Sequence, residues 1–334
     1  PLKKMYKAFS YYHLPDGRVV ALWKHALTAI SNDGGKTWPE NAYRAPGFVN
    51  SNAKIWGQKT PDGKYATVYN PSEFRWPLAV STSIDGLKYE NLFLVHGDIT
   101  AMRYGGNYKS RGPQYVRGIL ENNGNPDDGN MWVTYSVNKE DIWVSKVPIP
   151  ITNKVTKHAN DRFNLLPEGK ELDSWNIYSP LWAPVKIEKL KNGERWLALK
   201  DWDPFDYAKA ERVLPVSKNL NLSFSVLPKQ NDKGNLQIEI QNTKGHACTR
   251  IIFDNDGLIK LKTGARYNTL EKYVPDKVYH FNLCLTTVNR SISIKLNDNK
   301  ESTRLFFNPV ESFQRIVFRT GDIPDNPIPN TPAD

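Results

Sequence analysis

The sequence is poor in features that define several protein classes. It has only two cysteines in 334 residues, Cys248 and Cys284, which cannot form a disulfide framework. We expect buried thiols there, with one disulfide as the alternative. No dense run of lysine and arginine occurs, so we expect no nucleic acid partner. No segment is long and apolar enough to span a membrane, and no apolar run has helical spacing.

What the chain does contain favours many short strands and turns. Glycine and proline number 21 and 23 and are spread along the sequence, and aromatic residues make up 12%. This composition predicts an all-β fold. The net charge of +10 has two readings. Dispersed lysines favour solubility, whereas a basic surface favours acidic partners such as uronate, sulfate or sialate sugars.

One short motif is specific. Ser31–Trp38 fits the pattern Ser-x-Asp-x-Gly-x-x-Trp, called an Asp box, in which Asp binds nearby backbone N–H groups and Gly permits the turn. Ser83–Tyr89 is a degenerate copy, one residue shorter and with Tyr in place of Trp. These motifs resemble those of the sialidase-like β-propellers, and the resemblance implies a propeller made of antiparallel blades.

Four hairpin-rich units precede residue 215, and each contains an Asp-Gly or Asn-Gly turn, a strong hairpin signal. Their spacing is about that of propeller blades, ~40–50 residues. The strands predicted are 6–12, 19–23 and 26–30; 54–59, 65–69 and 78–81; 115–120, 131–135 and 142–146; and 185–189, 196–200 and 209–213. Because sialidase-like propellers have six blades, we expect further N-terminal blades outside this chain; an unusually small propeller is the alternative.

The pattern changes after Pro215, where strands follow one another at short spacing. Leu236, Ile238 and Ile240 alternate with polar residues, which is typical of a half-buried strand. We therefore predict a propeller over 1–215, an antiparallel jelly-roll β-sandwich over 216–323 that resembles concanavalin-like lectin domains, and a Pro-rich tail over 324–334.

In a propeller, the link from the second to the third strand and the link between blades share one rim, opposite the Asp boxes. By the family resemblance this rim binds sugar, using carboxylates, arginines and aromatic rings. The predicted catalytic residues are Glu73, Tyr108, Asp203 and His25, and the predicted substrate-binding residues are Arg75, Arg103, Arg111, Trp76 and Trp202.

The resemblance to sialidases implies that arginines grip the substrate carboxylate and that a tyrosine is the nucleophile. Tyr104 is an alternative to Tyr108 for that role. Arg117 fits the grip by residue type, or it points from its strand into a neighbouring unit. The alternative interpretation of each arginine is a surface ion pair without a role in binding. For His25 the alternative is a hydrogen-bonded structural histidine.

We predict no metal site and no cofactor. A structural Ca²⁺ at Asp201, Asp203 and Asp206 is the alternative, and a solvated acidic turn is the favoured explanation of these three residues. The expected partner is an oligosaccharide or polysaccharide, and the basic charge favours an anionic one. The expected location is secreted, periplasmic or cell-surface.

The favoured function is glycoside hydrolysis of an acidic or deoxy sugar in a complex polysaccharide. Two rivals stay open. The first is a polysaccharide lyase on a uronate-containing glycan, which would use His25, Tyr108 and Arg75. The second is a non-catalytic glycan-binding protein.

Overall fold

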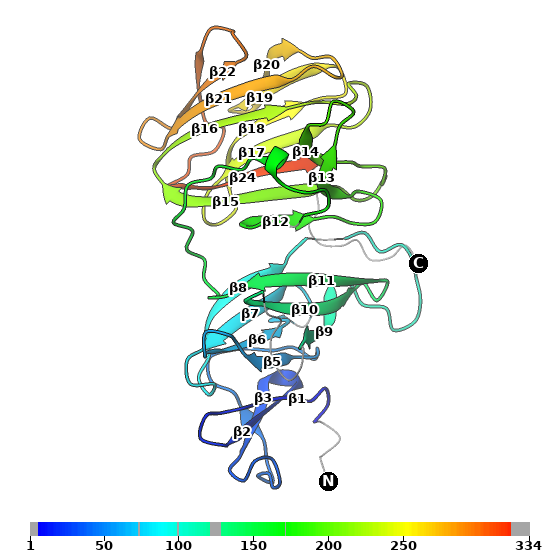
Figure 1. The fold of residues 1–334 in the computed structure, drawn as a ribbon, viewed down its shortest axis with the longest axis vertical. Helices are drawn as coiled ribbons and strands as arrows, with labels where there is room; N and C mark the ends of the chain where they lie inside the picture. Colours follow the sequence, from blue (N-terminus) through cyan, green and yellow to red (C-terminus); the bar gives the residue numbers. More distant parts are fainter. Residues whose placement is uncertain (1–5, 73, 99, 121–127, 171, 322–334) are drawn as a thin grey trace. The chain divides into compact units, whose positions relative to one another are not determined.

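The computed structural model describes residues 6–72, 74–98, 100–120, 128–170 and 172–321. Within them the regular structure consists of strands and two short 3-10 turns, so the all-β prediction is confirmed (Figure 1). The chain divides into two compact units, with the change between Asn153 and Lys154. Each unit is described by itself below. No helix in this described part is long and apolar enough to cross a membrane.

Unit 1 holds three antiparallel sheets, with strand orders β1-β2-β3-β4, β5-β6-β7-β8 and β11-β10-β9. Their elements are β1 (Ser10–His13), β2 (Val19–Trp23), η1 (Lys24–Ala26), β3 (Leu27–Ser31), β4 (Tyr43–Arg44), β5 (Trp56–Lys59), β6 (Tyr65–Tyr69), β7 (Leu78–Ser83), β8 (Glu90–His96), β9 (Pro113–Ile119), β10 (Asn130–Val137) and β11 (Asp141–Pro148). The first three predicted hairpin units therefore each form one sheet. Gly17 and Gly63, with φ of 86° and 80°, supply the left-handed backbone that the first two hairpin turns need.

The three sheets stack through aromatic and aliphatic side chains. One core joins the first two sheets and includes Tyr12, Leu22 and Tyr65, and a second core joins the next two and includes Val68 and Met131. The first strands of the sheets are neighbours, since β1 contacts β5 and β5 contacts β9. The sheets thus follow one another in chain order around their first strands.

The Asp box forms the predicted turn after β3. Asp33 accepts hydrogen bonds from the Thr37 N–H at 2.9 Å and the Thr37 hydroxyl at 2.6 Å, and the Trp38 indole donates to Gly35 O at 3.1 Å. The degenerate box lies at the equivalent place after β7, where Asp85 accepts from Leu87 N at 2.8 Å. Because successive hairpin links lie at opposite ends of a sheet, the boxes are at the far end from the links that follow β2 and β6.

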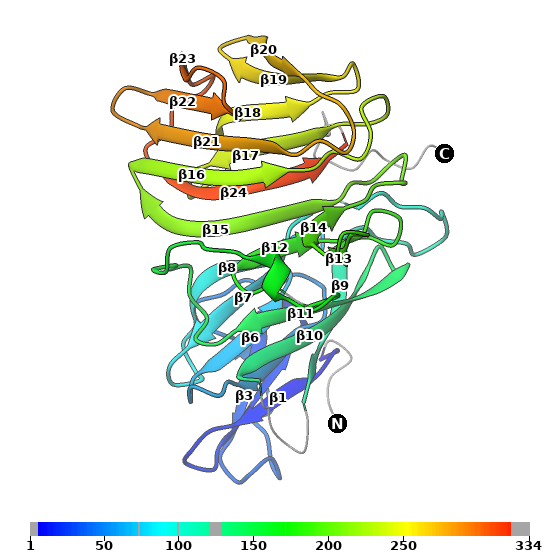
Figure 2. The same ribbon diagram turned by 45° about the horizontal axis from the view of Figure 1, so that its top comes forward.

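Unit 2 contains a seven-stranded sheet, order β12-β15-β24-β17-β18-β19-β20, and a four-stranded sheet, order β16-β21-β22-β23. Its elements are η2 (Phe163–Leu165), β12 (Trp175–Tyr178), β13 (Val185–Lys189), β14 (Arg195–Leu199), β15 (Lys209–Ser217), β16 (Asn219–Val226), β17 (Leu236–Gln241), β18 (Ala247–Phe253), β19 (Leu258–Thr263), β20 (Arg266–Lys272), β21 (Tyr279–Thr286), β22 (Ser291–Leu296), β23 (Ser302–Leu305) and β24 (Phe313–Thr320). Figure 2 shows β16, β21 and β22 as one layer of this unit.

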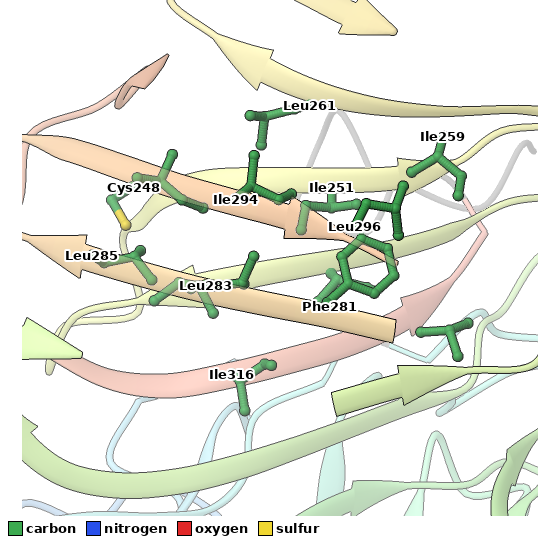
Figure 3. Close-up of a cluster of buried hydrophobic side chains, with 14 of the residues drawn as sticks. Cys248, Ile251, Ile259, Leu261, Phe281, Leu283, Leu285, Ile294, Leu296 and Ile316 are labelled. Carbon is green, nitrogen blue, oxygen red and sulfur yellow. The ribbon is translucent and has the colours of Figure 1, made fainter. Parts of the chain in front are cut away.

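The two sheets enclose one apolar core, as the predicted sandwich requires. Ile251 and Leu261 from the larger sheet face Leu283 and Ile294 from the smaller one (Figure 3). Their strands alternate buried and exposed positions, as β21 does from the buried Tyr279 to the buried Leu285. The antiparallel sandwich is confirmed.

The fourth predicted hairpin unit differs from the other three. β13 and β14 form a two-stranded hairpin, but β15 pairs with β12 and β24 instead of β14. Ala210 and Leu214 thereby bury apolar surface within unit 2. The predicted boundary at residue 215 falls inside β15, and the structure divides earlier, after Asn153. The predicted tail over 324–334 lies outside the described residues.

Both cysteines are free thiols on the sandwich. Cys248 is buried in its core and Cys284 is exposed. The expectation of a buried thiol is therefore met at Cys248 alone, and the alternative of a disulfide is excluded. Burial raises the pKa of the Cys248 thiol to about 12, so this thiol is unreactive at neutral pH.

Candidate functional site

The links expected to share one rim converge in unit 1. Lys24, after β2, donates to Asn52 Oδ1 at 3.2 Å. Arg75, after β6, reaches the same link by donating to Asn52 O at 3.4 Å. It also donates to Gln114 Oε1 at 2.5 Å and to Ser110 Oγ at 3.4 Å. Arg75 therefore ties the second sheet to both inter-sheet links.

Gly112 shows how closely these links approach. Its φ is 83°, and a Cβ added there would come within 2.5 Å of Arg75 O. Its N–H donates to Asn138 Oδ1 at 2.9 Å. Only glycine fits at this point, because the backbone of the Arg75 link occupies the space of a side chain.

Tyr115 lies at the centre of a cationic cluster that we define as Lys54, Arg75, Lys139 and Tyr115. The three cations lie 5.4, 5.6 and 5.8 Å from the centre of the Tyr115 ring. Arg75, Tyr115 and Lys139 have φ values of 56°, 60° and 58°. Such backbone is uncommon for residues with a side chain, and it persists where surrounding contacts hold it.

The charge of this cluster has no counter-charge among the residues that the structure describes. In the described part of the chain no carboxylate forms an ion pair with Lys54, Arg75 or Lys139. The interaction of the Tyr115 hydroxyl with Arg75 is the largest cause that lowers the pKa of Tyr115, and the charge of Lys139 adds to it. Burial and the charge of Arg75 lower the pKa of nearby Lys24. An excess of positive charge around a phenol favours an anionic ligand or the phenolate.

A second cluster lies on the neighbouring loop and is charge-compensated. The Glu140 side chain is only 3% exposed and accepts hydrogen bonds from Tyr104 N at 2.8 Å and Lys109 Nζ at 3.0 Å. Burial raises its pKa, but these hydrogen bonds outweigh burial and the pKa of Glu140 is lowered overall. Arg103 Nη2 donates to both carboxylate oxygens of Asp141, at 2.6 and 2.7 Å. We call Glu140, Asp141, Arg103 and Lys109 the paired cluster.

The predicted site residues of unit 1 divide accordingly. Arg75 belongs to the cationic cluster, whereas Arg103 is already held by Asp141. Tyr108 is 92% exposed, and its backbone O accepts a hydrogen bond from Lys139. Trp76 is 41% exposed, and its indole donates to Gly97 O at 3.1 Å. Glu73 lies outside the described residues.

Three further residues complete this comparison. His25 is exposed, and its N–H donates to Ser51 O at 3.0 Å, so it belongs to the same rim. Arg111 is half-buried on the link before β9. Arg117 points into the neighbouring sheet, with its guanidinium 5.9 Å from the Trp56 ring centre.

Trp202 and Asp203 belong to unit 2. Trp202 is 67% exposed with Lys200 5.9 Å from its ring centre, and Asp203 caps its own turn by accepting from Phe205 N at 2.9 Å. Asp201 accepts from the Thr320 hydroxyl at 2.8 Å and Asp206 from the Tyr178 hydroxyl at 2.9 Å. Burial raises the pKa of Asp201. These aspartates are engaged in local hydrogen bonds, and the described residues contain no group of three or more His, Cys, Asp or Glu arranged for a metal.

Sequence reasoning missed Tyr115, Lys54 and Lys139 as site residues. Tyr115 was expected only as the first residue of a strand, and its positive φ cannot be read from residue type. Lys139 lies in a link that the sequence assigned to the rim. Its location could therefore be predicted, but its contact with Tyr115 could not.

Comparison with known proteins points to one group. The family model described as "Sialidase-like, CBM domain" matches residues 175–334. A solved protein described as "Sialidase" is 55% identical, with a TM-score of 0.92, and the match covers 100% of this chain and 30% of that one. The chain therefore spans about 30% of the length of this relative. No curated protein matches the chain.

Two other solved structures share little with it. Trypanosoma rangeli sialidase in complex with 2,3-difluoro-KDN is 13% identical with a TM-score of 0.30, over 96% of this chain and 57% of that one. Sheep galectin-11 in complex with glycerol is 12% identical with a TM-score of 0.27, over 33% of this chain and 88% of that one.

Proposed function

We propose that this sialidase-like chain is part of a glycoside hydrolase that acts on an acidic sugar, with the cationic cluster of unit 1 as the site that receives the sugar's anionic group. The observation that carries the proposal is the convergence of Lys54, Arg75 and Lys139 on Tyr115 without an ion-pair partner in the described residues. The identity of 55% to a solved sialidase supports a sialic acid or similar carboxylated sugar as the substrate.

Tyr115 takes the role that the sequence assigned to Tyr108. Its lowered pKa makes the phenolate more accessible than in an ordinary tyrosine. The phenolate attacks the anomeric carbon, the bond to the leaving sugar breaks, and an acid protonates the leaving oxygen. Water then releases the sugar from the tyrosine. Arg75 and Lys54 hold the substrate's carboxylate during both steps. Glu73 remains the proposal for the acid.

A propeller is the fold that we propose for the complete protein. Its support is the neighbouring first strands β1, β5 and β9, and the apolar outer faces at both ends of the stack. On the first sheet, Phe9 and Tyr11 are 40% and 53% exposed and stack at 5.5 Å. On the third, Ile142 and Val144 are 76% and 51% exposed. Further sheets of the same kind would cover these faces. A secreted, periplasmic or cell-surface location suits an enzyme of polysaccharide breakdown.

The test is sugar release from a panel of acidic glycans by the chain, compared with Tyr115→Phe. We expect the variant to retain binding of the acidic sugar, because the three cations remain, and to lose release by at least about a hundredfold. Tyr108→Phe is the matched control and should release sugar as the parent does. Unchanged release by Tyr115→Phe would contradict the role of Tyr115.

The lyase keeps one specific observation in its favour. A phenol of lowered pKa beside three cations also suits proton abstraction next to a uronate carboxyl group, with the cations neutralising the enolate. The product decides between the two reactions. A lyase leaves an unsaturated sugar that absorbs in the ultraviolet, and a hydrolase does not.

A further inference from the structure

The two outward faces of the sandwich in unit 2 differ in chemistry. The outward residues of the four-stranded sheet are mostly short and polar, with His280 and Lys295 as longer side chains, and several of them hydrogen-bond to one another. Ser223 donates to Asn282 at 2.7 Å, and Ser293 and Thr303 are 2.7 Å apart. Described strand residues on this face include no Phe, Tyr or Trp. The ring that described strand residues offer a sugar there is the imidazole of His280, which lies 2.8 Å from Ser225 Oγ.

The seven-stranded sheet carries a row of larger groups on its outward face. Four adjacent strands contribute one residue each, because the register pairs Glu239 of β17 with Arg250 of β18, Arg250 with Lys262 of β19, and Lys262 with Tyr267 of β20. Figure 1 shows these strands side by side. Paired residues point to the same side of a sheet, so the four side chains form one continuous strip.

Arg250 is fixed at the centre of this strip. Its Nε donates to Glu239 Oε1 at 2.7 Å and its Nη1 to the Tyr267 hydroxyl at 3.2 Å. Gln241 Nε2 donates a hydrogen bond to the other carboxylate oxygen, Glu239 Oε2, at 2.7 Å. The Arg250 and Glu239 side chains are 16% and 14% exposed. These groups are thus preorganised before any ligand arrives.

Lys262 completes the strip with an uncompensated charge. Its ammonium lies 4.8 Å from the centre of the Phe307 ring and 5.7 Å from that of Tyr267. Arg250 lies 5.6 Å from the same Phe307 ring. Described carboxylates form no ion pair with Lys262, whereas Arg250 is paired with Glu239. Rings, fixed donors and one unpaired cation therefore meet at one place.

We propose that Arg250, Lys262, Tyr267 and Phe307 form the glycan-binding subsite of unit 2, and that it takes a sugar bearing a carboxylate or sulfate. The sugar's C–H face lies on the Phe307 and Tyr267 rings, and its anionic group pairs with Lys262. Free Arg250 N–H groups and the Tyr267 hydroxyl bind the sugar hydroxyls. This subsite is separate from the cationic cluster of unit 1, and it rests on the proposed function only in expecting a glycan as the ligand.

The experiment is calorimetric titration of the whole chain, carrying Arg75→Gln to weaken the unit 1 site. The ligands are 3′-sialyllactose, a glucuronate disaccharide, sulfated lactose and neutral lactose. We expect Lys262→Gln to weaken binding of the acidic ligands by about 10- to 100-fold, as loss of a charged hydrogen bond does. Phe307→Leu should weaken the acidic ligands and lactose alike. Lys295→Gln, on the outward face of the four-stranded sheet, is the matched control and should change nothing.

Each outcome bears on the proposal. If Lys262→Gln binds all ligands as tightly as its Arg75→Gln parent, or if Lys295→Gln alone loses binding, the subsite is elsewhere. Absence of any binding in the Arg75→Gln parent also overturns it. Selective loss for carboxylated or for sulfated ligands identifies which anion the subsite takes. The proposed function fails separately, when Arg75→Gln binds and releases sugar as the unaltered chain does.

Discussion

The cationic cluster and the paired cluster of unit 1 are built from neighbouring links, and both contain arginine and lysine, yet carboxylates accompany these cations in the paired cluster alone. In the paired cluster, Glu140 and Asp141 neutralise Lys109 and Arg103. In the cationic cluster, the hydrogen bonds that Arg75 donates to described residues go to neutral groups of Gln114, Ser110 and Asn52. The comparison shows that residue type alone does not identify an anion grip. What distinguishes the two is whether the protein supplies the counter-charge.

The largest effect should come from breaking the paired cluster. Glu140→Gln removes a buried charge that neutralises Lys109 and organises the backbone at Tyr104. We expect the free energy of unfolding to fall by about 3 kcal/mol, as when one partner of a buried ion pair is lost. Denaturant titration measures it. Asp141→Asn, at a side chain 36% exposed, is the control and should cost less than about 1 kcal/mol. Equal effects of the two substitutions would show that burial does not separate these carboxylates.

Ligand binding should depend on the cationic cluster and hardly at all on the paired cluster. Arg75→Gln should weaken binding of an acidic sugar to the unit 1 site by about 10- to 100-fold, because a charged hydrogen bond is lost. Arg103→Gln should change that affinity by less than about threefold, because Asp141 already holds this arginine. Both are measured in a chain carrying Lys262→Gln, so that the unit 2 subsite does not contribute. A larger loss in Arg103→Gln would reverse the assignment.

The pH dependence of the cationic cluster should be intermediate in size. The pKa of Tyr115 is lowered from 10.0, so its phenolate forms at a lower pH than in ordinary tyrosine. The phenolate's contribution to stability is full above pH 10 and is lost as pH falls through the lowered pKa. Affinity for an acidic sugar should fall as pH rises through the same value, because the phenolate repels it. Ultraviolet titration of the chain against Tyr115→Phe reads this pKa. Arg75→Gln should move the midpoint upward, and a midpoint unaffected by Arg75 would rule out the coupling.

The smallest effect concerns the hydrogen-bonded carboxylate of Asp33 in the Asp box, which belongs to neither cluster. Hydrogen bonds from Thr37 to the Asp33 side chain lower the pKa of Asp33 from 3.8. The Asp box should therefore keep its full stability above pH 3.8 and lose it as pH falls through the lowered pKa. The protection factor of the Thr37 amide, which is its hydrogen exchange rate compared with the intrinsic rate at the same pH, should fall at acid pH in the parent. In Asp33→Asn this protection should be low at every pH, and high protection in that variant would show that the carboxylate is dispensable.

Local patterns predicted much of the fold. The predicted strands of the first three units, the Asp-Gly turns of the first two and the Asp box depend on residues that are close in sequence, and these are present in the structure. The strands that the sequence did not predict are β4, β8, β12, β20 and β23. The side chains of β20 and β23 are mostly exposed and show no apolar alternation. The pattern of β15 was recognised, but its partner was not.

The sequence by itself determined most strand positions, the hairpin turns of the first two units and the links of unit 1 that lie close together, since alternation and turn chemistry act within a few residues. Only the tertiary structure decided that β15 joins β24, that Arg103 is neutralised and that Arg75, Lys54 and Lys139 surround Tyr115. These outcomes depend on which distant side chains approach closely enough to pair. Coulomb and hydrogen-bond energies fall off over a few ångströms, and the distance in space between two side chains cannot be read from their separation along the chain.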